Sequence, residues 1–447
     1  MLLHRKNRAT RQSGKCRASL LRAGYTVLGY LFSPLILLYL FYRSRRQPAY
    51  LEHLGERLGS VPLRASQAPL IWIHAVSVGE TRAAQPLIEK LLETYPEHEI
   101  LITHMTPTGR ATSNELFAQH GARLHIHYLP YDFPLAIRRF LKRMRPTLLL
   151  LMETELWPNL IHEAKKAGCK LALINARLSE KSLRKTQRVR SLARHALLSL
   201  DEIAAQTYPD AARLQSLCGR SPSVTGNLKF DIWPTRQQTE AGQALRAQCL
   251  SRGERSEKTR PILLLASTRE GEEALLLKAH ADYVKEDWLL ILVPRHPQRF
   301  DAVADWLRLH GVSYQRRSTN EPIQPETQVL LGDTMGEMFV YYEACDVAFI
   351  GGSLLPLGGQ NLIEACAVGR PVLIGEHTFN FAEATVQAIE AGAAARVRDA
   401  EQVFLQMQRL QLEPTTRETM AKAALAFSQR HRGATQRTLE LIKPLLP

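Results

Sequence analysis

Residues 70–80 read LIWIHAVSVGE, a short apolar run followed by a turn with one glycine and the start of an amphipathic stretch. An apolar run of this length that ends in turn residues is typical of a buried strand, and the amphipathic continuation is typical of a helix. Further runs of the same kind occupy residues 99–104, 147–152 and 170–176. Helical stretches separate them, for example residues 80–93 and 159–167. This alternation predicts a doubly wound α/β domain with a parallel sheet.

The same alternation returns in the second half of the chain. The apolar runs there are residues 261–267, 288–294, 327–333, 347–353 and 370–376. The stretch between the two series, residues 231–260, is polar and contains Pro234, which predicts the domain junction. We therefore expect an N-terminal anchor (1–46), a first Rossmann-like domain (47–235) and a second one (236–447). The last helix could pack back on the first domain. Two such domains would face a cleft, with ligands beyond the carboxyl ends of the strands.

Composition and charge limit the classes of protein. Of the 447 residues, 45% are hydrophobic and 23% are charged, which is ordinary for a folded protein. The net charge of +15 is concentrated near the start, where residues 1–22 hold no acidic side chain. This excess suits nucleic acid, anionic lipid or a phosphorylated substrate, although a solvated basic tail has the same composition. The six cysteines are scattered without a CxxC pair, which argues against a disulfide framework or a zinc site.

Residues 23–42, AGYTVLGYLFSPLILLYLFY, contain no charged side chain. As a helix they extend about 30 Å, the thickness of a bilayer's hydrocarbon core. Arg43, Arg45 and Arg46 follow where a signal peptide would need small residues, so cleavage is disfavoured. A transmembrane span and a half-inserted interfacial anchor both remain open. In either case the basic flanks would bind anionic head groups.

Three loops of the first domain carry candidate catalytic side chains. Glu80 stands near a helix start, where it could accept a proton from a hydroxyl or merely complement the helix dipole. Glu153 and Glu155 follow the most apolar strand and could orient a hydroxyl, position a base, bind cations or cap a helix. Lys229 lies in GNLKFD near the junction, where it could reach the cleft or simply be solvated.

The second domain offers loops suited to a nucleotide. Pro294 and Arg295 directly follow a strand, and a guanidinium there can bind phosphate. Met335, Gly336 and Glu337 lie in a loop that leads into a helix, which suits an anion or a plain turn.

The most informative loop runs from Gly351 to Glu364, GGSLLPLGGQNLIE. Asn361 and Glu364 are three residues apart and would share one face of a helical turn, where Glu364 can accept hydrogen bonds from both ribose hydroxyls. The glycines would accommodate phosphate. This order of residues in the second of two α/β domains indicates nucleotide-sugar binding. The absence of a Walker A sequence, of GxGxxG at the first strand and of HExxH disfavours ATP hydrolysis, dinucleotide redox chemistry and zinc hydrolysis.

Taken together, the motifs resemble the Kdo (3-deoxy-D-manno-octulosonic acid) transferases of lipid A core biosynthesis. The resemblance runs from about Leu20 to the C-terminus and rests on HAVSVGE, THMTPTGR, METELWPN, INARLSEKS, TGNLKFD, PRHPQRF, GDTMGEM, GGSLLPLGGQN and HTFNF. It implies a GT-B glycosyltransferase on the cytoplasmic side of the bacterial inner membrane. It also implies inverting transfer of Kdo from CMP-Kdo to lipid IVA without a metal or other cofactor, and no nucleic-acid partner.

The resemblance also implies roles for single residues. Glu80 would be the general base that deprotonates the acceptor hydroxyl, and Glu153 or Glu155 together with Lys229 would support the transition state. The CMP-binding set would be Pro294, Arg295, Met335, Gly336, Glu337, Asn361, Leu362, Ile363 and Glu364. The donor phosphate and sugar would lie against Ser353, Gly358 and Gly359.

Two departures and three alternatives accompany this resemblance. Gln360 stands where the family frequently has His, and Ala365 where it frequently has Pro.

A GT-B sugar-nucleotide epimerase would use the same ribose carboxylate but would need no membrane segment. A non-catalytic membrane protein that binds the lipid A precursor would not need Asn361 and Glu364. A nucleic-acid binder would need an aromatic-rich basic surface, whereas the cations here cluster around the apolar segment.

Overall fold

The computed structural model describes residues 2–45, 47–250, 260–283 and 288–446, with side chains described from residue 19 onward except at 281 and 282. The chain forms two compact units. Unit 1 comprises residues 1–231 and 433–447, and unit 2 comprises residues 232–432. The division after Asp231 precedes the expected boundary at 235/236, and the chain returns to unit 1 for its last fifteen residues.

Unit 1 contains a seven-stranded, fully parallel sheet in the order β3-β2-β1-β4-β5-β6-β7. Its strands are β1 (Leu70–His74), β2 (Glu99–His104), β3 (Leu124–Tyr128), β4 (Leu148–Met152), β5 (Lys170–Ala176), β6 (Glu202–Ala205) and β7 (Ser223–Val224). The order reverses between β1 and β4, so the loops after these two central strands lie at the switch point of the sheet.

Alternate residues of the central strands enter two separate cores. Leu70 and Trp72 of β1 belong to the core on one face, whereas Ile71 and Ile73 belong to the core on the other. All five residues of β1 are buried. Continuous apolar runs are therefore required here, because helices cover both faces of the sheet.

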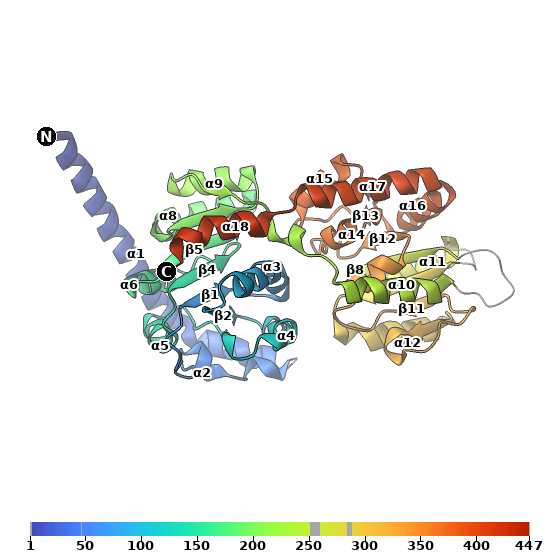
Figure 1. Cartoon of the computed structure of the whole chain (residues 1–447), viewed down its shortest axis with the longest axis horizontal. Coiled ribbons are helices and arrows are strands. Elements are labelled where there is room, and N and C mark those ends of the chain that lie inside the picture. Colours follow the sequence, from blue (N-terminus) through green and yellow to red (C-terminus); the bar gives the residue numbers. More distant parts are fainter. Residues whose placement is uncertain (1, 46, 251–259, 284–287, 447) are drawn as a thin grey trace. The chain divides into compact units, whose positions relative to one another are not determined.

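The helices of unit 1 are α1 (Leu2–Ser44), α2 (Leu54–Arg57), α3 (Val78–Thr94), α4 (Pro107–Leu116), α5 (Pro134–Met144), α6 (Pro158–Lys166), α7 (Glu180–Gln187), α8 (Arg190–Ser199), α9 (Tyr208–Cys218) and α18 (Ala434–Ile442). Figure 1 shows α18, the red C-terminal helix, among the blue and green elements of this unit. Leu439 and Ile442 of α18 are part of the same core as Ile71. Helix α18 also packs against α3, so the end of the chain supports the helix that follows β1.

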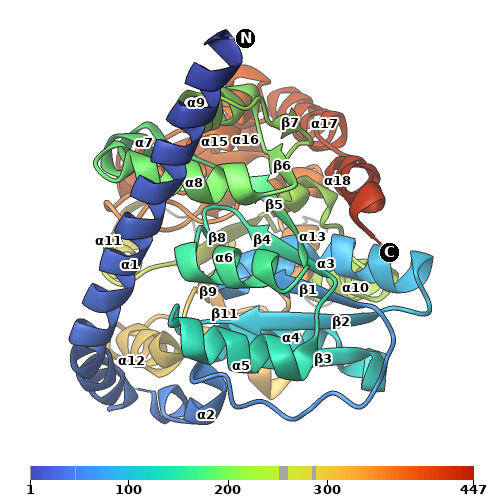
Figure 2. The same ribbon diagram turned by 90° about the vertical axis from the view of Figure 1, so that its left-hand side faces the viewer.

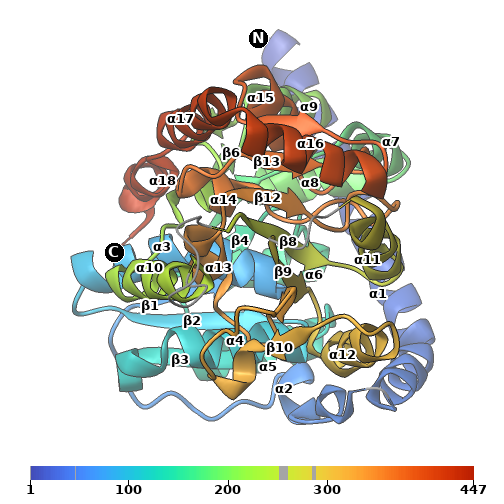
Figure 3. The same cartoon turned by 90° about the vertical axis from the view of Figure 1, so that its right-hand side faces the viewer.

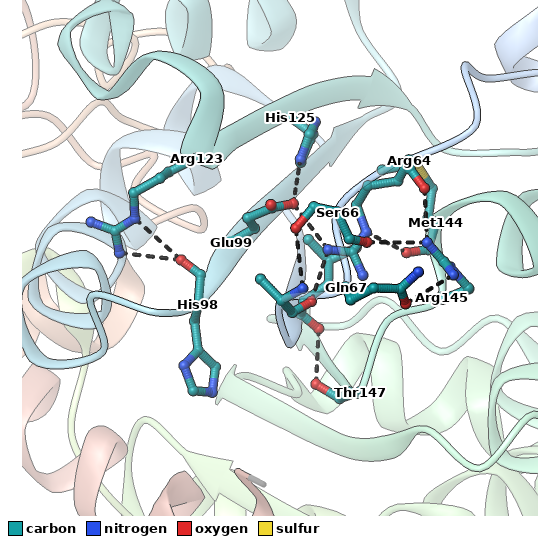
Figure 4. A network of polar contacts seen from close by, with 12 residues as sticks. Arg64, Ser66, Gln67, His98, Glu99, Arg123, His125, Met144, Arg145 and Thr147 are labelled. Atoms are coloured by element: carbon teal, nitrogen blue, oxygen red, sulfur yellow. Dashed lines mark hydrogen bonds and ion pairs between the residues drawn. The ribbon is translucent and has the colours of Figure 1, made fainter.

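A polar network fastens the amino edge of this sheet (Figure 4). Glu99, at the start of β2, accepts hydrogen bonds from Arg64 at 3.0 Å and His125 at 2.8 Å. Arg145 reaches the backbone carbonyl of Arg64 and the side chain of Gln67. These contacts hold the segment before β1 against the sheet. They lie at the edge opposite the carboxyl ends of the strands, where ligands bind in folds of this kind.

Unit 2 repeats the plan with a second parallel seven-stranded sheet, ordered β10-β11-β9-β8-β12-β13-β14. Its strands are β8 (Ile262–Thr268), β9 (Leu289–Pro294), β10 (Tyr314–Arg316), β11 (Val329–Leu331), β12 (Val347–Ile350), β13 (Val372–Ile374) and β14 (Ala394–Arg396). Its helices are α10 (Arg236–Leu250), α11 (Glu272–Tyr283), α12 (Phe300–Leu309), α13 (Met338–Ala344), α14 (Ile363–Ala367), α15 (Ala382–Glu390), α16 (Ala400–Leu412) and α17 (Pro414–Arg430). Figure 3 shows α10 and α13 on one side of the sheet and α11 and α12 on the other.

The structure confirms the nine strands expected from the apolar runs and adds five short ones, β3, β6, β7, β10 and β14. Those five lie toward the sheet edges, where a strand needs no long apolar run. The stretch 231–260 was expected to be the junction, and the division after Asp231 falls at its start; α10 follows within the same stretch and packs on α13. Residues 251–259 lie outside the described part of the chain.

The apolar segment at residues 23–42 lies within α1. Between Ser19 and Ser44 this helix has a mean hydropathy of 1.6 and is long and apolar enough to cross a membrane. Along it, large apolar side chains are exposed at Leu20, Leu21, Val27, Leu28, Tyr30, Leu31, Phe32, Leu35, Leu37, Leu38, Tyr39, Phe41 and Tyr42. An exposed surface of this size and composition suits lipid better than water.

Candidate functional site

The carboxyl edge of the unit 1 sheet brings together the four side chains proposed from the sequence for catalysis. Glu80 lies in the first turn of α3, directly after β1, and its Oε2 accepts a 2.6 Å hydrogen bond from the backbone N–H of Val76. This bond folds the carboxylate back over the turn that precedes the helix. Glu80 therefore has a fixed position at the switch point of the sheet, as a base at a reaction centre requires.

Glu153 and Lys229 form an ion pair beside Glu80. The Lys229 Nζ donates to Glu153 Oε1 at 3.0 Å, and both side chains are largely buried. Glu153 follows β4 directly and has a left-handed backbone, with φ of +53°. Non-glycine residues seldom adopt this conformation, and it persists where surrounding contacts maintain it. Here the N–H of Glu153 is bonded to the carbonyl of Ile174 in the neighbouring strand at 3.0 Å.

The surroundings of Glu80 make its carboxylate unusually basic. The pKa of Glu80 is raised to about 8: burial is the largest cause, the negative charges of Glu153 and Glu155 add to it, and the Val76 N–H and Lys229 oppose it. A base with a pKa close to the working pH combines a usable fraction of the charged form with strong proton affinity. Burial thus sets the proton affinity of Glu80 in the first place, and two neighbouring carboxylates and one ammonium adjust it.

Glu155 is held in the same cluster by two aromatic neighbours. The indole N–H of Trp157 donates to Glu155 Oε2 at 2.8 Å, and His74 Nε2 lies 3.9 Å from the same oxygen. His74 is fully buried at the end of β1, and burial lowers its pKa to about 3, so it is neutral at ordinary pH. Burial also raises the pKa of Glu155. The indole bond therefore orients a carboxylate that has little compensating positive charge nearby.

The loop that carries Lys229 is fastened by side chains from distant parts of unit 1. Asn175, fully buried near the end of β5, accepts a 3.0 Å hydrogen bond from the backbone N–H of Leu228 through its Oδ1. Asp231 accepts bonds from the N–H groups of Gly433 and Thr435, at 2.7 and 2.6 Å, at the start of α18. Asn175 itself has a left-handed φ of +50°. The position of the Lys229 ammonium thus depends on β5 and on the last helix of the chain.

In unit 2 the backbone of the glycine-rich loop after β12 is held in place by one carboxylate. Glu272, the fully buried first residue of α11, accepts bonds from the N–H groups of Gly352, Ser353 and Leu354, at 2.5, 2.9 and 2.9 Å. The Ser353 hydroxyl is also buried and bonds the carbonyl of Ile350 and the N–H of Gly375. These amides and this hydroxyl already have partners within the protein, so their direct contribution is to shape the loop.

The second half of the same loop presents the polar pair expected from the sequence. Asn361 Nδ2 donates to Glu364 Oε1 at 3.0 Å, and Asn361 Oδ1 accepts from the N–H of Ile363 at 3.1 Å. Leu362 and Ile363 are fully buried, which fixes the turn. Gly358 and Gly359 have φ of +96° and +72°, and a Cβ at Gly358 would come within 2.3 Å of Asn380. Glycine is therefore required there by both backbone conformation and space.

The remaining nucleotide candidates lie in loops at the same edge of the unit 2 sheet. Pro294 ends β9, and the guanidinium of Arg295 donates to Gln360 Oε1 at 3.2 Å. In the loop after β11, Glu337 accepts a hydrogen bond from Arg317 at 3.1 Å. Met335 is exposed, and Gly336, which lies between Met335 and Glu337, has a left-handed φ of +83°. Gln360 thus orients Arg295 from the position where histidine is frequent in the resembling family.

Sequence reasoning did not single out Asn175, Trp157, Gln206 or Glu272. Asn175 and Trp157 lie inside motifs that were recognised as wholes, INARLSEKS and METELWPN. Gln206 bonds the backbone carbonyl of Asn175 at 3.0 Å. Glu272 precedes the loop it supports by 80 residues and carries no local signal of that role. Of these residues only Asn175 carries a local signal: it stands at the end of a predicted strand, and Asn tolerates the left-handed backbone that a sharp turn there requires.

Comparison with known proteins addresses the family and the fold of the chain. The family model described as 3-Deoxy-D-manno-octulosonic-acid transferase (kdotransferase) matches residues 52–232. The glycosyltransferase structure from Rickettsia africae superposes with a TM-score of 0.56 over 85% of this chain and 99% of that one, at 12% identity, which shows a shared GT-B fold.

Two relatives cover almost the whole chain. The 3-deoxy-D-manno-octulosonic acid transferase of Haemophilus influenzae is 37% identical over 428 residues, 94% of this chain and 98% of the relative. That of Bordetella pertussis is 45% identical over 439 residues, 95% of this chain and 99% of the relative. The chain, a GT-B glycosyltransferase in fold, therefore belongs to the 3-deoxy-D-manno-octulosonic acid transferase family.

Proposed function

We propose that the protein transfers Kdo from CMP-Kdo to lipid IVA, with inversion at the anomeric carbon, at the cytoplasmic face of the inner membrane. The observation that carries the proposal is the Glu80 carboxylate, fixed at the switch point of the unit 1 sheet with its pKa raised to about 8. Its setting suits proton abstraction from a hydroxyl. Family membership supplies the sugar, and the exposed apolar α1 suits an enzyme whose acceptor is a lipid.

The proposed reaction is a single displacement. Glu80 takes the proton of the lipid IVA primary hydroxyl while the hydroxyl oxygen bonds to the anomeric carbon of Kdo. The bond from that carbon to the phosphate oxygen of CMP breaks, and its electron pair leaves with CMP. One base and one attack invert the configuration. The Lys229 ammonium, held by Glu153, supports the transition state.

Unit 2 would hold the donor. Glu364 would accept hydrogen bonds from the ribose hydroxyls, with Asn361 holding one of its oxygens. Arg295, oriented by Gln360, would bind the phosphate of CMP. Pro294, Met335, Gly336, Glu337, Leu362 and Ile363 would shape the CMP site, and Ser353, Gly358 and Gly359 the loop around the sugar. A monophosphate leaving group carries less charge than a diphosphate, so we propose that neither a metal nor another cofactor is required.

The direct test is incubation of the purified full-length protein with lipid IVA and CMP-Kdo, followed by mass spectrometry. We expect a product heavier than lipid IVA by one or more Kdo residues, together with free CMP. A sugar-nucleotide epimerase would instead convert the donor without acceptor, and a non-catalytic binder of the lipid precursor would leave both substrates unchanged. Either of those two results would contradict the proposal.

Replacing Glu364 with alanine should weaken CMP binding. Removing the acceptor of two ribose hydroxyl bonds, and the partner of Asn361, is expected to raise the Kd for CMP by about ten- to a hundredfold. Isothermal calorimetry with CMP measures this directly. Glu390→Ala, which removes an exposed carboxylate at the end of α15, is the matched control and should leave the Kd unchanged. If the Glu364 variant and the wild type bind CMP with equal Kd, Glu364 does not bind the ribose.

Asn175 should act through Lys229, and two substitutions that tolerate its left-handed backbone test this. Asn175→Gly loses the acceptor of the Leu228 N–H, whereas Asn175→Asp keeps an acceptor oxygen there. Displacing the ammonium by about 1 Å is expected to lower kcat about a hundredfold in the glycine variant. The aspartate variant should retain more activity.

The decisive measurement for Asn175 is a double-mutant cycle. In a Lys229→Ala background, Asn175→Gly should cause no further loss of kcat, because the side chain it positions is gone. If both backgrounds lose kcat equally, Asn175 acts on the fold and not on Lys229.

A further inference from the structure

Helix α1 is docked on unit 1 along one narrow face. Figure 2 shows it crossing α8 and α6, and both helices contact it. The less exposed residues of its apolar half recur every three or four positions, at Arg22, Tyr25 with Thr26, Gly29, Ser33, Ile36 and Leu40. This spacing places them on one stripe, which extends for about 27 Å along the helix. The remaining directions carry the exposed apolar side chains.

The docking contacts near the start of the apolar segment are polar. Thr26 Oγ1 and Arg22 Nη1 both donate to Asn159 Oδ1, at 3.1 and 3.4 Å. Asn159 is fully buried and donates through Nδ2 to the backbone carbonyl of Asp132 at 2.7 Å. One turn farther along, Tyr30 stacks on Phe133 with ring centroids 4.7 Å apart. The first half of the apolar segment is therefore fixed to the loops that begin α5 and α6.

This arrangement is unfavourable for a helix perpendicular to the membrane. The contacts of Thr26 and Tyr30 lie in the first half of the segment that would cross the hydrocarbon core. A perpendicular helix would carry Asn159 and Asp132, which are linked to Thr26, into the hydrocarbon, where polar groups are costly. A helix in the plane of the interface keeps its docked stripe on the protein and turns its apolar side chains into the lipid.

The helices beside α1 expose a group of unpaired cations. Lys181, Arg184, Lys185, Arg188 and Arg194 are all exposed on α7, α8 and their connection. Within the described residues none of these five makes an ion pair, whereas Glu180, the sole acidic residue from 177 to 199, pairs with Arg213. Val189 and Leu198 are exposed among them. Cations interspersed with apolar side chains, next to an apolar helix, match the chemistry of an anionic bilayer surface.

We propose that α1 lies in the plane of the membrane interface and that α7 and α8 bind anionic phospholipid head groups beside it. The two features together supply the two signals that stable attachment requires, apolar insertion and charge. A second consequence follows from Asn159, which is two residues from Trp157, the partner of Glu155. The loop with the candidate catalytic carboxylates thus lies next to the lipid phase. A lipid acceptor could reach it directly from the bilayer, a step that rests on the proposed function.

Binding to vesicles tests the charged face. We expect Arg184→Gln/Arg188→Gln/Arg194→Gln, made in the full chain, to lower partitioning onto phosphatidylglycerol-containing vesicles by about a hundredfold. Partitioning onto pure phosphatidylcholine vesicles, driven by α1, should stay unchanged. The matched control is Lys278→Gln/Arg398→Gln/Lys422→Gln, which removes the same charge from exposed positions of unit 2 and should bind like wild type. Equal loss in the two triple variants, or no loss in the first, would refute the head-group contact.

Depth measurements test the orientation of α1. Single cysteines at Leu28, Leu35 and Tyr42, all exposed and seven residues apart, carry a fluorophore in a Cys16→Ser background. The other five cysteines are buried and should not react. An in-plane helix gives three equal depths in quenching by lipid-attached groups. A perpendicular span gives a label at Leu35 about 10 Å deeper than one at Tyr42, and that result would overturn the proposal.

These two experiments measure membrane partitioning and the depth of α1, and neither depends on enzymatic turnover. A protein that fails to transfer Kdo but shows the expected partitioning would contradict the proposed function alone. A protein that transfers Kdo with graded label depths would contradict the in-plane arrangement alone.

Discussion

Glu80→Gln is expected to lower the rate of Kdo transfer by about a thousandfold or more while leaving the Kd for CMP unchanged. The amide cannot accept the hydroxyl proton, and general base catalysis typically contributes a factor of about 10²–10⁴. Glutamine can still accept the bond from the Val76 N–H through its Oε1, so the turn before α3 should keep its shape. Single-turnover assays with lipid IVA and CMP-Kdo measure the rate. Near-normal turnover by this variant would contradict the assignment of the base.

The pH profile provides an independent measurement of the same residue. Because a base must be unprotonated and the pKa of Glu80 is raised to about 8, kcat/KM should rise with pH through a limb near pH 8. The limb should be absent from the residual activity of Glu80→Gln.

Stability should change in the opposite direction to activity. A carboxyl whose folded pKa lies above its ordinary 4.5 contributes full stability below pH 4.5 and loses it as pH rises toward 8. Glutamine removes this loss. The variant is therefore expected to melt about 5 °C higher than wild type at pH 9 and at the same temperature at pH 4. Calorimetric scans at the two pH values measure the difference, and an equal Tm at pH 9 would show that Glu80 is not held in a costly environment.

Lys229→Ala is the second substitution with a large expected effect. It removes the ammonium that neutralises Glu153 at 3.0 Å and that lowers the pKa of Glu80. We expect kcat to fall by about 10²–10³, as for the loss of one group that stabilises charge in a transition state. The limb of the pH profile should also move to higher pH, because an unneutralised Glu153 makes Glu80 harder to ionise.

Lys229→Arg is the matched control, because it keeps a cation within reach of Glu153. It should restore the position of the pH limb even if its kcat is reduced. A profile that does not move in Lys229→Ala would show that the lysine has no electrostatic effect on Glu80, whatever the loss of rate.

The sequence predicted much of the candidate site because its residues follow strands directly. Glu153 and Arg295 directly follow a buried strand and Glu80 follows one after a short loop, and the carboxyl ends of parallel strands share one edge of a sheet. Asn361 and Glu364 were expected to share a face from their spacing, and the structure joins them by a hydrogen bond. Local order along the chain was sufficient in these cases.

The supporting residues could not be predicted in the same way. Asn175 and Leu228 are 53 residues apart, Glu272 and Gly352 are 80 apart, and Asp231 and Gly433 are 202 apart. None of these pairs has a periodicity or a motif that links its members, because the contact exists only once two separate segments have packed. The stretch 231–260 was expected to hold the junction, and the division between the units falls at its start; the helix α10 that follows was not predicted, and it packs on α13.

The sequence by itself determined the two parallel sheets, the apolar first helix and the family, because apolar periodicity and strand-end motifs are local properties of the chain. Only the tertiary structure decided how basic Glu80 is, how Lys229 is held and which face of α1 is docked. Each of these depends on burial and on distances between segments far apart in the chain. The free energy of ionising a side chain is set by the neighbours that it meets only after folding.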